Sequence, residues 1–262
     1  MKSIMERKDE VKVYQNENVY EAFNHRLEYI CSYFDHLIIS FSGGKDSGLM
    51  LELVLLYYES HEWMKKGIKV SVFYLDYEGN YQETKDYIER SMGKYPEFDY
   101  YHVCLPVSAS CGISMSQSTW LPWDPGHQEL WLNSIPPEAI CLENQEFPFF
   151  KVGMSDYEFQ SKFCQWLHRE KEAVRTAVLV GIRAQESLNR YNAVTREETF
   201  SRFGTTNYSH RISQDVFNFY PMYDWLFEDI WRANAKFELD YNHLYDLYYQ
   251  AGVPYKSMRV TN

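Results

Sequence analysis

A six-residue loop sits between two segments of opposite character, and it constrains the fold of this chain more than any other feature. Before it, residues 37–41 (LIISF) form a short, wholly apolar run, which is typical of a buried parallel strand. After it, residues 48–60 (GLMLELVLLYYES) have the pattern of a helix. The loop reads Ser42-Gly43-Gly44-Lys45-Asp46-Ser47. Glycines allow a tight turn and close approach to a ligand, so a strand–loop–helix unit of this kind predicts a phosphate or sulfate site.

The side chains of the loop support this interpretation. Ser42 and Ser47 supply hydroxyl groups and Lys45 supplies a cation, while the helix start supplies unpaired N–H groups and a positive dipole end. Asp46 is unusual there, because a carboxylate repels phosphates unless a divalent metal lies between them. We therefore predict Asp46 as a magnesium ligand, with helix capping as the alternative. The loop is not a Walker A motif, whose spacing it does not satisfy.

Strand-like and helix-like segments alternate along most of the chain. This alternation predicts an α/β fold, with five parallel strands flanked by helices and joined by right-handed crossovers. We expect one domain over residues 1–262, with a Trp/Pro-rich insertion at about 108–150 after the third strand and a helical C-terminal segment at about 224–251. The expected strands are 37–41, 69–76, 100–107, 176–183 and 215–220; the expected helices are 17–34, 48–60, 82–92, 155–172, 224–236 and 240–251.

Composition limits the classes of partner. With 26 Lys and Arg against 37 Asp and Glu, the formal net charge is −11, which argues against autonomous binding of nucleic acid or an anionic membrane. The apolar runs are too short to span a bilayer, and the charged N-terminus lacks the apolar stretch of a signal peptide. We therefore expect a cytoplasmic protein. The five cysteines contain no C-x-x-C pair, so we expect no iron–sulfur cluster.

The loop also carries a family resemblance. SGGKDS after an apolar strand resembles the PP-loop of the adenine nucleotide alpha-hydrolase (HUP-type) superfamily, and FSGGKDS resembles the phosphoadenosine phosphosulfate (PAPS) reductase family. LDYEGNYQET, at 75–84, is similar to that family's Asp-Thr-Gly-x-x-Phe-Pro-Glu-Thr segment. Asp76, Glu83 and Thr84 match, whereas Tyr81 and Gln82 replace Phe and Pro. The resemblance implies that Asp76 lies near the adenosine; alternatively, Asp76 only ends a strand and caps the next segment.

Two later segments extend the resemblance in the family's order. GIRAQES, at 181–187, resembles a Gly-x-Arg-x-x-Glu-Ser motif, in which Gly181, Arg183, Glu186 and Ser187 match. The planar guanidinium of Arg183 suits phosphate or sulfate oxygens, and Arg190 lies one helical turn beyond Glu186. The alternative is a surface Arg183–Glu186 pair of little energetic value. The segment at 220–231 also resembles the family, but we expect its Trp and Asp residues to have a structural role in packing and not a chemical one.

The resemblance implies a site for ATP or PAPS, with magnesium left open. It assigns catalytic roles to Lys45, Asp46 and Arg183. The expected nucleotide-binding residues are Ser42, Gly43, Gly44, Lys45, Asp46, Ser47, Asp76, Gly181, Arg183, Glu186, Ser187 and Arg190.

The chain departs from true sulfonucleotide reductases in one respect. Those enzymes use a cysteine near the C-terminus, whereas no cysteine follows Cys164, and Tyr, Lys or Arg cannot replace a thiolate nucleophile. We therefore expect nucleotidyl transfer (an ATP pyrophosphatase) or a sulfonucleotide-type transferase rather than thiol-dependent reduction.

Two alternatives remain. One is a non-catalytic nucleotide-binding regulatory subunit, with a protein partner, and the other is a component of a nucleic-acid sulfur-modification system. The C-terminal segment of the chain also resembles an uncharacterised branch of the PAPS reductase-like family, which includes the immunoglobulin-binding regulator A proteins. That branch implies that related chains continue beyond Asn262.

Overall fold

The computed structural model describes residues 16–111, 116–195 and 201–260. The charged start of the chain, on which the cytoplasmic expectation rests, lies outside these residues. Within the described ranges no helix is long and apolar enough to cross a membrane.

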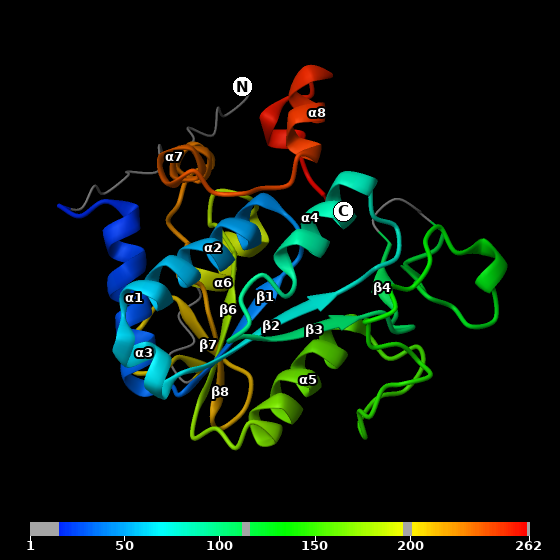
Figure 1. The fold of residues 1–262 in the computed structure, drawn as a ribbon, viewed down its shortest axis with the longest axis horizontal. Helices are drawn as coiled ribbons and strands as arrows, with labels where there is room; N and C mark the ends of the chain where they lie inside the picture. Colours follow the sequence, from blue (N-terminus) through cyan, green and yellow to red (C-terminus); the bar gives the residue numbers. More distant parts are fainter. Residues whose placement is uncertain (1–15, 112–115, 196–200, 261–262) are drawn as a thin grey trace, which may run out of the picture.

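The fold is built on one large sheet, which Figure 1 shows with helices on both faces. Its strand order is β3-β2-β1-β6-β8-β7, and each neighbouring pair except β7–β8 is parallel. The predicted α/β fold with five parallel strands is therefore confirmed, and the antiparallel edge strand β7 is an addition that we did not predict. The strands are β1 (His36–Phe41), β2 (Lys69–Leu75), β3 (Asp99–Val103), β6 (Thr176–Val180), β7 (Ser209–Arg211) and β8 (Val216–Phe219).

The strand order reverses direction between β1 and β6. From β1 the chain adds β2 and β3 on one side, and it then returns to add β6 and β8 on the other side. Ligands of open α/β sheets bind outside the carboxyl ends of the strands at such a switch point. The loop after β1 and the segment after β6 both lie there, although 134 residues separate Gly181 from Ser47 in the sequence.

Alternating strand residues pack two cores, one on each face of the sheet. On one face, Leu37 and Ile39 belong to a core formed with α1 (Val19–Tyr33), α2 (Lys45–Ser60), α4 (Gln82–Ser91) and α7 (Phe227–Phe237). On the other, Ile38 packs with Phe159 and Phe163 of α5 (Asp156–Glu170). Successive strand side chains point to opposite faces, so one apolar run supplies both cores. The remaining helices are α3 (Glu62–Gly67), α6 (Leu188–Thr195) and α8 (Leu244–Gln250).

Several element boundaries differ from the sequence predictions. α2 begins at Lys45 rather than residue 48, so part of the loop forms the first helical turn. β6 ends at Val180, which places Arg183 beyond the strand. β3 ends at Val103 rather than residue 107. Helix α7 begins at Phe227, so Trp225 precedes it and packs as a buried core side chain instead.

The segment between β3 and α5 contains little regular structure. It holds the short pair β4 (Ala109–Ser110) and β5 (Thr119–Trp120) and the 3₁₀ turn η1 (Gln128–Leu130). Cys104, Trp123 and Ala139 form a small separate core there. The indole N–H of Trp123 donates to the carbonyl of Asp76 at 2.8 Å, so this segment is fastened to the loop that follows β2.

Candidate functional site

The turn after β1 requires Gly43. Its φ is +70°, in the left-handed region that favours glycine. A Cβ atom there would also lie 3.2 Å from side-chain atoms of Ile88 and Thr84. The carbonyl of Gly43 accepts a hydrogen bond from Nδ2 of Asn242 at 2.9 Å, so the C-terminal part of the chain fixes this turn.

Two hydroxyl groups close the loop on itself. Ser47 Oγ accepts from the backbone N–H of Ser42 at 3.1 Å, and the two hydroxyl oxygens lie 2.9 Å apart. Gly44 precedes α2 as its N-cap and makes no side-chain cap hydrogen bond. The first N–H groups of a helix lack intrahelical partners; here that of Lys45 donates to the hydroxyl of Tyr245, and the next ones lie beside two hydroxyl groups.

The segment after β6 packs directly on the start of α2. A Cβ atom at Gly181 would lie 3.1 Å from the backbone nitrogen of Ser47, which is tighter than ordinary van der Waals contact. Glycine at this position lets the end of β6 approach the helix backbone. The matched Gly181 of the sequence motif therefore lies against the loop.

A buried ionic group joins the two segments. Asp46 Oδ1 accepts from Nε of Arg183 at 2.5 Å, and Oδ2 lies 3.1 Å from Nζ of Lys45. Arg183 is 3% exposed and Lys45 is 7% exposed. The sequence-predicted catalytic residues are thus in direct contact. Because each Asp46 oxygen already faces a cation, the residues do not fit a magnesium ion on Asp46 without displacing one of them; the magnesium role remains a prediction.

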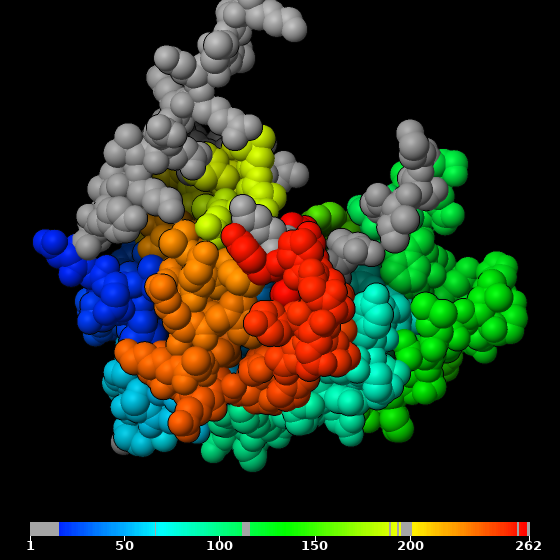
Figure 2. Space-filling view, turned by 90° about the horizontal axis from the view of Figure 1, so that it is seen from above, coloured from blue at the N-terminus to red at the C-terminus, as the bar shows by residue number. Residues whose placement is uncertain are grey.

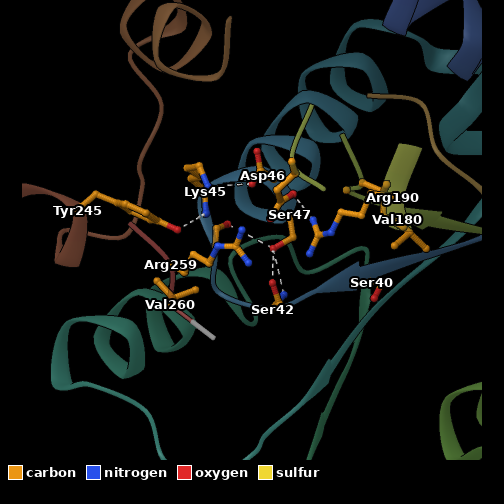
Figure 3. Close-up of a pocket in the computed structure, with 14 residues that line it drawn as sticks. Ser40, Ser42, Lys45, Asp46, Ser47, Val180, Arg190, Tyr245, Arg259 and Val260 are labelled. Carbon is orange, nitrogen blue, oxygen red and sulfur yellow. Dashed lines mark hydrogen bonds and ion pairs between the residues drawn. The ribbon is translucent and has the colours of Figure 1, made fainter. Parts of the chain in front are cut away.

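A cavity of about 220 Å³ opens above the loop. Figure 3 shows the guanidinium groups of Arg190 and Arg259 approaching Ser42 and Ser47 from opposite sides of it. Arg190 is also paired with Glu186, one turn earlier in the chain. Of the residues predicted to bind the nucleotide, those lining this cavity are Ser42, Gly44, Lys45, Asp46, Ser47, Gly181, Glu186 and Arg190.

A second cavity, of about 290 Å³, adjoins the first and shares Lys45, Glu186 and Arg259 with it. Arg183 and Phe227 line the second cavity. Lys45 Nζ lies 5.9 Å from the centroid of the Phe227 ring. The two cavities together provide a charged end at the loop and an aromatic wall beyond it.

Two predicted site residues lie elsewhere. Asp76 lines a different and larger cavity, in which His102 and Trp123 also take part. Ser187 lines neither of the two cavities at the loop; its hydroxyl accepts from the backbone N–H of Arg190 at 3.2 Å and so caps the start of α6. Their roles in nucleotide binding remain predictions.

The C-terminal segment contributes residues that the sequence predictions missed. The hydroxyl of Tyr245 accepts from the backbone N–H of Lys45 at 3.2 Å, and burial raises the pKa of Tyr245. Arg259 lines both cavities. Figure 2 shows this segment, in red, beside α7 in orange. No local motif marks Tyr245 or Arg259, because only the folded chain brings them to the loop.

Residues 139–251 match the sequence profile of the phosphoadenosine phosphosulfate reductase domain. Over these residues, which include the 181–187 motif, the chain is similar to that domain. This confirms the resemblance that the loop and the 181–187 motif predicted. The chain is also 32% identical over 249 residues to the uncharacterized protein YbdN of Escherichia coli (strain K12). That alignment covers 93% of this chain and 58% of YbdN, so the chain spans little more than half the length of this relative.

Solved structures that resemble this chain do so at low identity. A PAPS reductase from Candida auris, in a phosphate complex, aligns with a TM-score of 0.43 at 14% identity, covering 90% of this chain and 93% of that one. The FMN adenylyltransferase of Candida glabrata with FMN and an ATP analogue gives 0.48 at 12% identity, covering 90% and 63%.

The cysteines of this chain lie away from the cavities at the loop. All five cysteines fall in the described ranges, and no cysteine lines either cavity at the loop. Cys31 is a buried residue of α1 and Cys164 a buried residue of α5, and they pack in the cores on opposite faces of the sheet. The thiols of this chain therefore do not line the cavities beside the buried cations at the loop.

Proposed function

We propose that this protein, which is similar to the PAPS reductase domain over residues 139–251, binds an adenine nucleotide by its phosphate groups and transfers the nucleotidyl group to an acceptor. The observation that carries the proposal is the convergence of Lys45, Arg183, Arg190 and Arg259 on the start of α2. In the step, the acceptor forms a bond to the α-phosphorus, the α–β bond breaks, pyrophosphate leaves, and the acceptor's proton passes to solvent.

The buried cations supply the electrostatic part of this step. Negative charge develops on the leaving pyrophosphate, and preorganised cations in a water-poor site stabilise such charge more than they would in bulk water. Lys45 and Arg183 are held in place before the ligand arrives, because Asp46 pairs with both. Asp46 then acts as a positioning residue, and the proposal routes no step through magnesium.

Transfer is favoured over thiol-dependent reduction by the placement of the cysteines. A reductase needs a thiolate that reaches the sulfur of its substrate, and the thiols of this chain line neither cavity at the loop. A sulfonucleotide remains a candidate ligand, because sulfate and phosphate oxygens accept the same hydrogen bonds. Only binding measurements separate ATP from PAPS.

The first experiment measures thermal unfolding with ATP, adenylyl sulfate, PAPS and pyrophosphate, each with and without magnesium. A ligand at 100 times its Kd stabilises the folded state by about 2.7 kcal/mol, which for a chain of this size raises Tm by roughly 5–10 °C. Lys45→Ala should abolish the shift. Lys94→Ala is the matched control, because Lys94 pairs with Glu52 instead. Equal shifts in both variants, or no shift with any ligand, would overturn the proposal.

The second experiment measures pyrophosphate release with nucleophilic acceptors. Release that requires ATP and is lost in Lys45→Ala supports nucleotidyl transfer. Binding without release from any acceptor, alone or with a partner protein, would instead favour the regulatory-subunit alternative and overturn the transferase proposal.

A further inference from the structure

Three side chains with different metal-binding atoms lie close together where the neighbouring strands β2 and β3 end, at the β3 edge of the sheet. β2 and β3 are parallel, with Tyr74 opposite His102 and Leu75 opposite Val103. Strand side chains alternate between faces, and continuing this register by one residue places Asp76 opposite Cys104. Asp76, His102 and Cys104 therefore share one face, where one ligand atom from each lies within 4.8 Å of the others.

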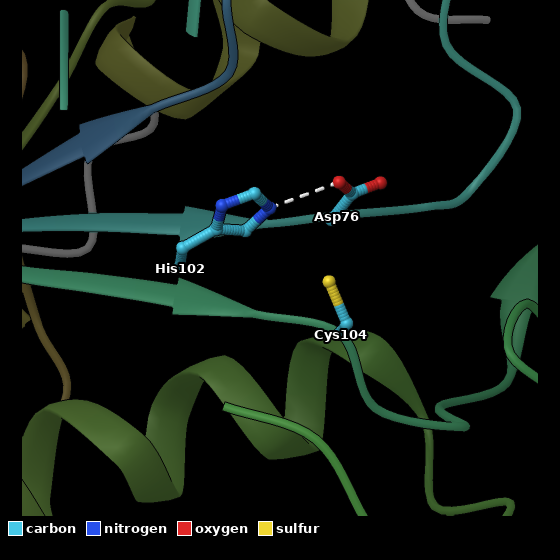
Figure 4. Close-up of side chains that lie close together, drawn as sticks. All are labelled: Asp76, His102 and Cys104. Atoms are coloured by element: carbon cyan, nitrogen blue, oxygen red, sulfur yellow. Dashed lines mark hydrogen bonds and ion pairs between the residues drawn. The ribbon is translucent and has the colours of Figure 1, made fainter. Parts of the chain in front are cut away.

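The cluster is largely buried and its atoms converge. Asp76 is 7% exposed and Cys104 is 1% exposed. Oδ2 of Asp76 lies 3.0 Å from Nε2 of His102, and Figure 4 shows the Cys104 sulfur pointing toward this pair. The hydrogen bond joins Asp76 and His102 directly, and Cys104, which packs with Trp123 and Ala139, brings its thiol close to the same pair.

The other oxygen of Asp76 is held by its own loop. Oδ1 accepts from the backbone N–H of Glu78 at 2.7 Å and from Nδ2 of Asn80 at 2.9 Å. The indole of Trp123 is hydrogen-bonded to the Asp76 carbonyl. Outer contacts of this kind orient metal-binding carboxylates, and here they leave Oδ2 directed at His102.

We propose that Asp76, His102 and Cys104 bind a single zinc ion. Zinc takes oxygen, nitrogen and sulfur ligands in tetrahedral sites, with bonds of about 2.0–2.3 Å. Such bonds separate the ligand atoms by roughly 3.3–3.8 Å, so separations of up to 4.8 Å within the cluster contract by at most about 1 Å on binding, and the Asp76–His102 pair at 3.0 Å opens slightly. On binding, the Cys104 thiol releases its proton to solvent, and the His102 ring carries its remaining proton on Nδ1.

The fourth zinc position would face a cavity. Asp76 and His102 line a space of about 810 Å³, together with Glu78, Asp86, Glu89 and Glu138. Lys85 is the one lysine among its described lining residues, so the cavity is predominantly acidic and favours a cation over a phosphate. Three protein ligands with one open position are typical of zinc sites that bind a water or substrate molecule. This site is separate from the cavities at the phosphate loop, and it goes beyond the proposed nucleotidyl transfer.

Cobalt substitution tests this proposal on the full chain. After chelator treatment and dialysis, one equivalent of Co²⁺ should give a thiolate-to-cobalt charge-transfer band and the intense visible bands of tetrahedral cobalt. Excess Zn²⁺ should remove both. Absence of these bands in the wild-type protein would overturn the proposal.

Matched variants locate the site. Cys104→Ser should abolish the charge-transfer band, and His102→Gln should weaken cobalt binding at least tenfold. Cys164→Ser is the control, because Cys164 is a buried thiol of α5 that packs in the core between this helix and the sheet, and it should leave the band unchanged. A band that survives in Cys104→Ser would overturn the assignment.

Nucleotide binding provides an independent readout. Circular dichroism and the ATP-induced Tm shift should be unchanged in folded Cys104→Ser protein, because Cys104 lines neither cavity at the phosphate loop. If Cys104→Ser fails to fold, native mass spectrometry of the wild type and of His102→Gln decides: one zinc per wild-type chain, lost in His102→Gln, supports the site. No zinc on the wild-type chain, or zinc retained in His102→Gln, overturns it.

Discussion

The backbone of Ser47 leaves no room for a side chain at Gly181. The Cβ of any other residue would lie 3.1 Å from the Ser47 nitrogen and 3.2 Å from its Cα. These are backbone atoms at the start of a helix, so they cannot rotate away as a flexible side chain can. The contact aligns the end of β6 with the phosphate loop and thereby brings Arg183 to Asp46.

Gly181→Ala should therefore push the first turn of α2 away from β6. We expect a loss of about 1–3 kcal/mol of unfolding free energy from overpacking, together with weaker nucleotide binding. Urea unfolding and nucleotide titration measure the two effects. Gly67→Ala is the control, because a Cβ at Gly67 meets no atom within 4 Å. Equal stability of the two variants would contradict this account.

Gly48 faces a different obstacle within α2. An added Cβ would lie 2.3 Å from the hydroxyl oxygen of Tyr87, a buried residue of α4. We expect Gly48→Ala to destabilise the protein by about 1–3 kcal/mol, even though alanine favours helix by about 1 kcal/mol. Tyr87→Phe removes the clashing oxygen, so the double variant should recover part of the loss. A double-mutant cycle measures that coupling, and additive effects would refute the predicted clash.

Asp46 competes with any anion for Lys45 and Arg183. Asp46→Asn removes that competition, so we expect pyrophosphate to bind about 3- to 10-fold more tightly without magnesium, which is up to about 1.4 kcal/mol. The ligand-free variant should be less stable, because two buried cations lose their shared carboxylate. Calorimetric titration checks the first effect and thermal unfolding the second. Weaker binding that appears only with magnesium would instead support Asp46 as a metal ligand.

His36, which lines neither cavity at the loop, makes the free energy of unfolding depend on pH. Burial lowers the pKa of His36 to about 4, and the charge of Lys171 acts in the same direction. Since the unfolded side chain titrates near 6.5, the unfolded state binds the extra proton between these values. Stability is therefore lost as pH falls from about 6.5 to about 4, by roughly 3 kcal/mol.

His36→Gln tests this effect without a titrating ring. His36 contacts the hydroxyl groups of Thr176 and Ser71 at 3.1 and 3.0 Å, and glutamine keeps the capacity for such hydrogen bonds. Urea unfolding at pH 7 and pH 4 should show the smaller acid-induced loss in the variant. Because carboxylates affect both proteins alike, parallel pH profiles would rule out the His36 contribution.

Local patterns in the chain were enough to predict the parallel α/β sheet and the turn between β1 and α2, and the family resemblance was enough to predict that the 181–187 motif lies beside that turn. An apolar strand, two glycines and a helix leave few alternative local structures for residues 37–60. Strand and helix ends were less well predicted, because pairing and packing determine where a strand stops.

Folding in three dimensions was needed to bring Arg259 and Tyr245 to the loop, to place Asp76 in a separate cavity and to assemble Asp76, His102 and Cys104. Such contacts depend on strand register and on the path of the C-terminal segment. They join residues that carry no common sequence pattern, since the free energy that brings them together comes from burial of the surrounding cores and not from the side chains themselves.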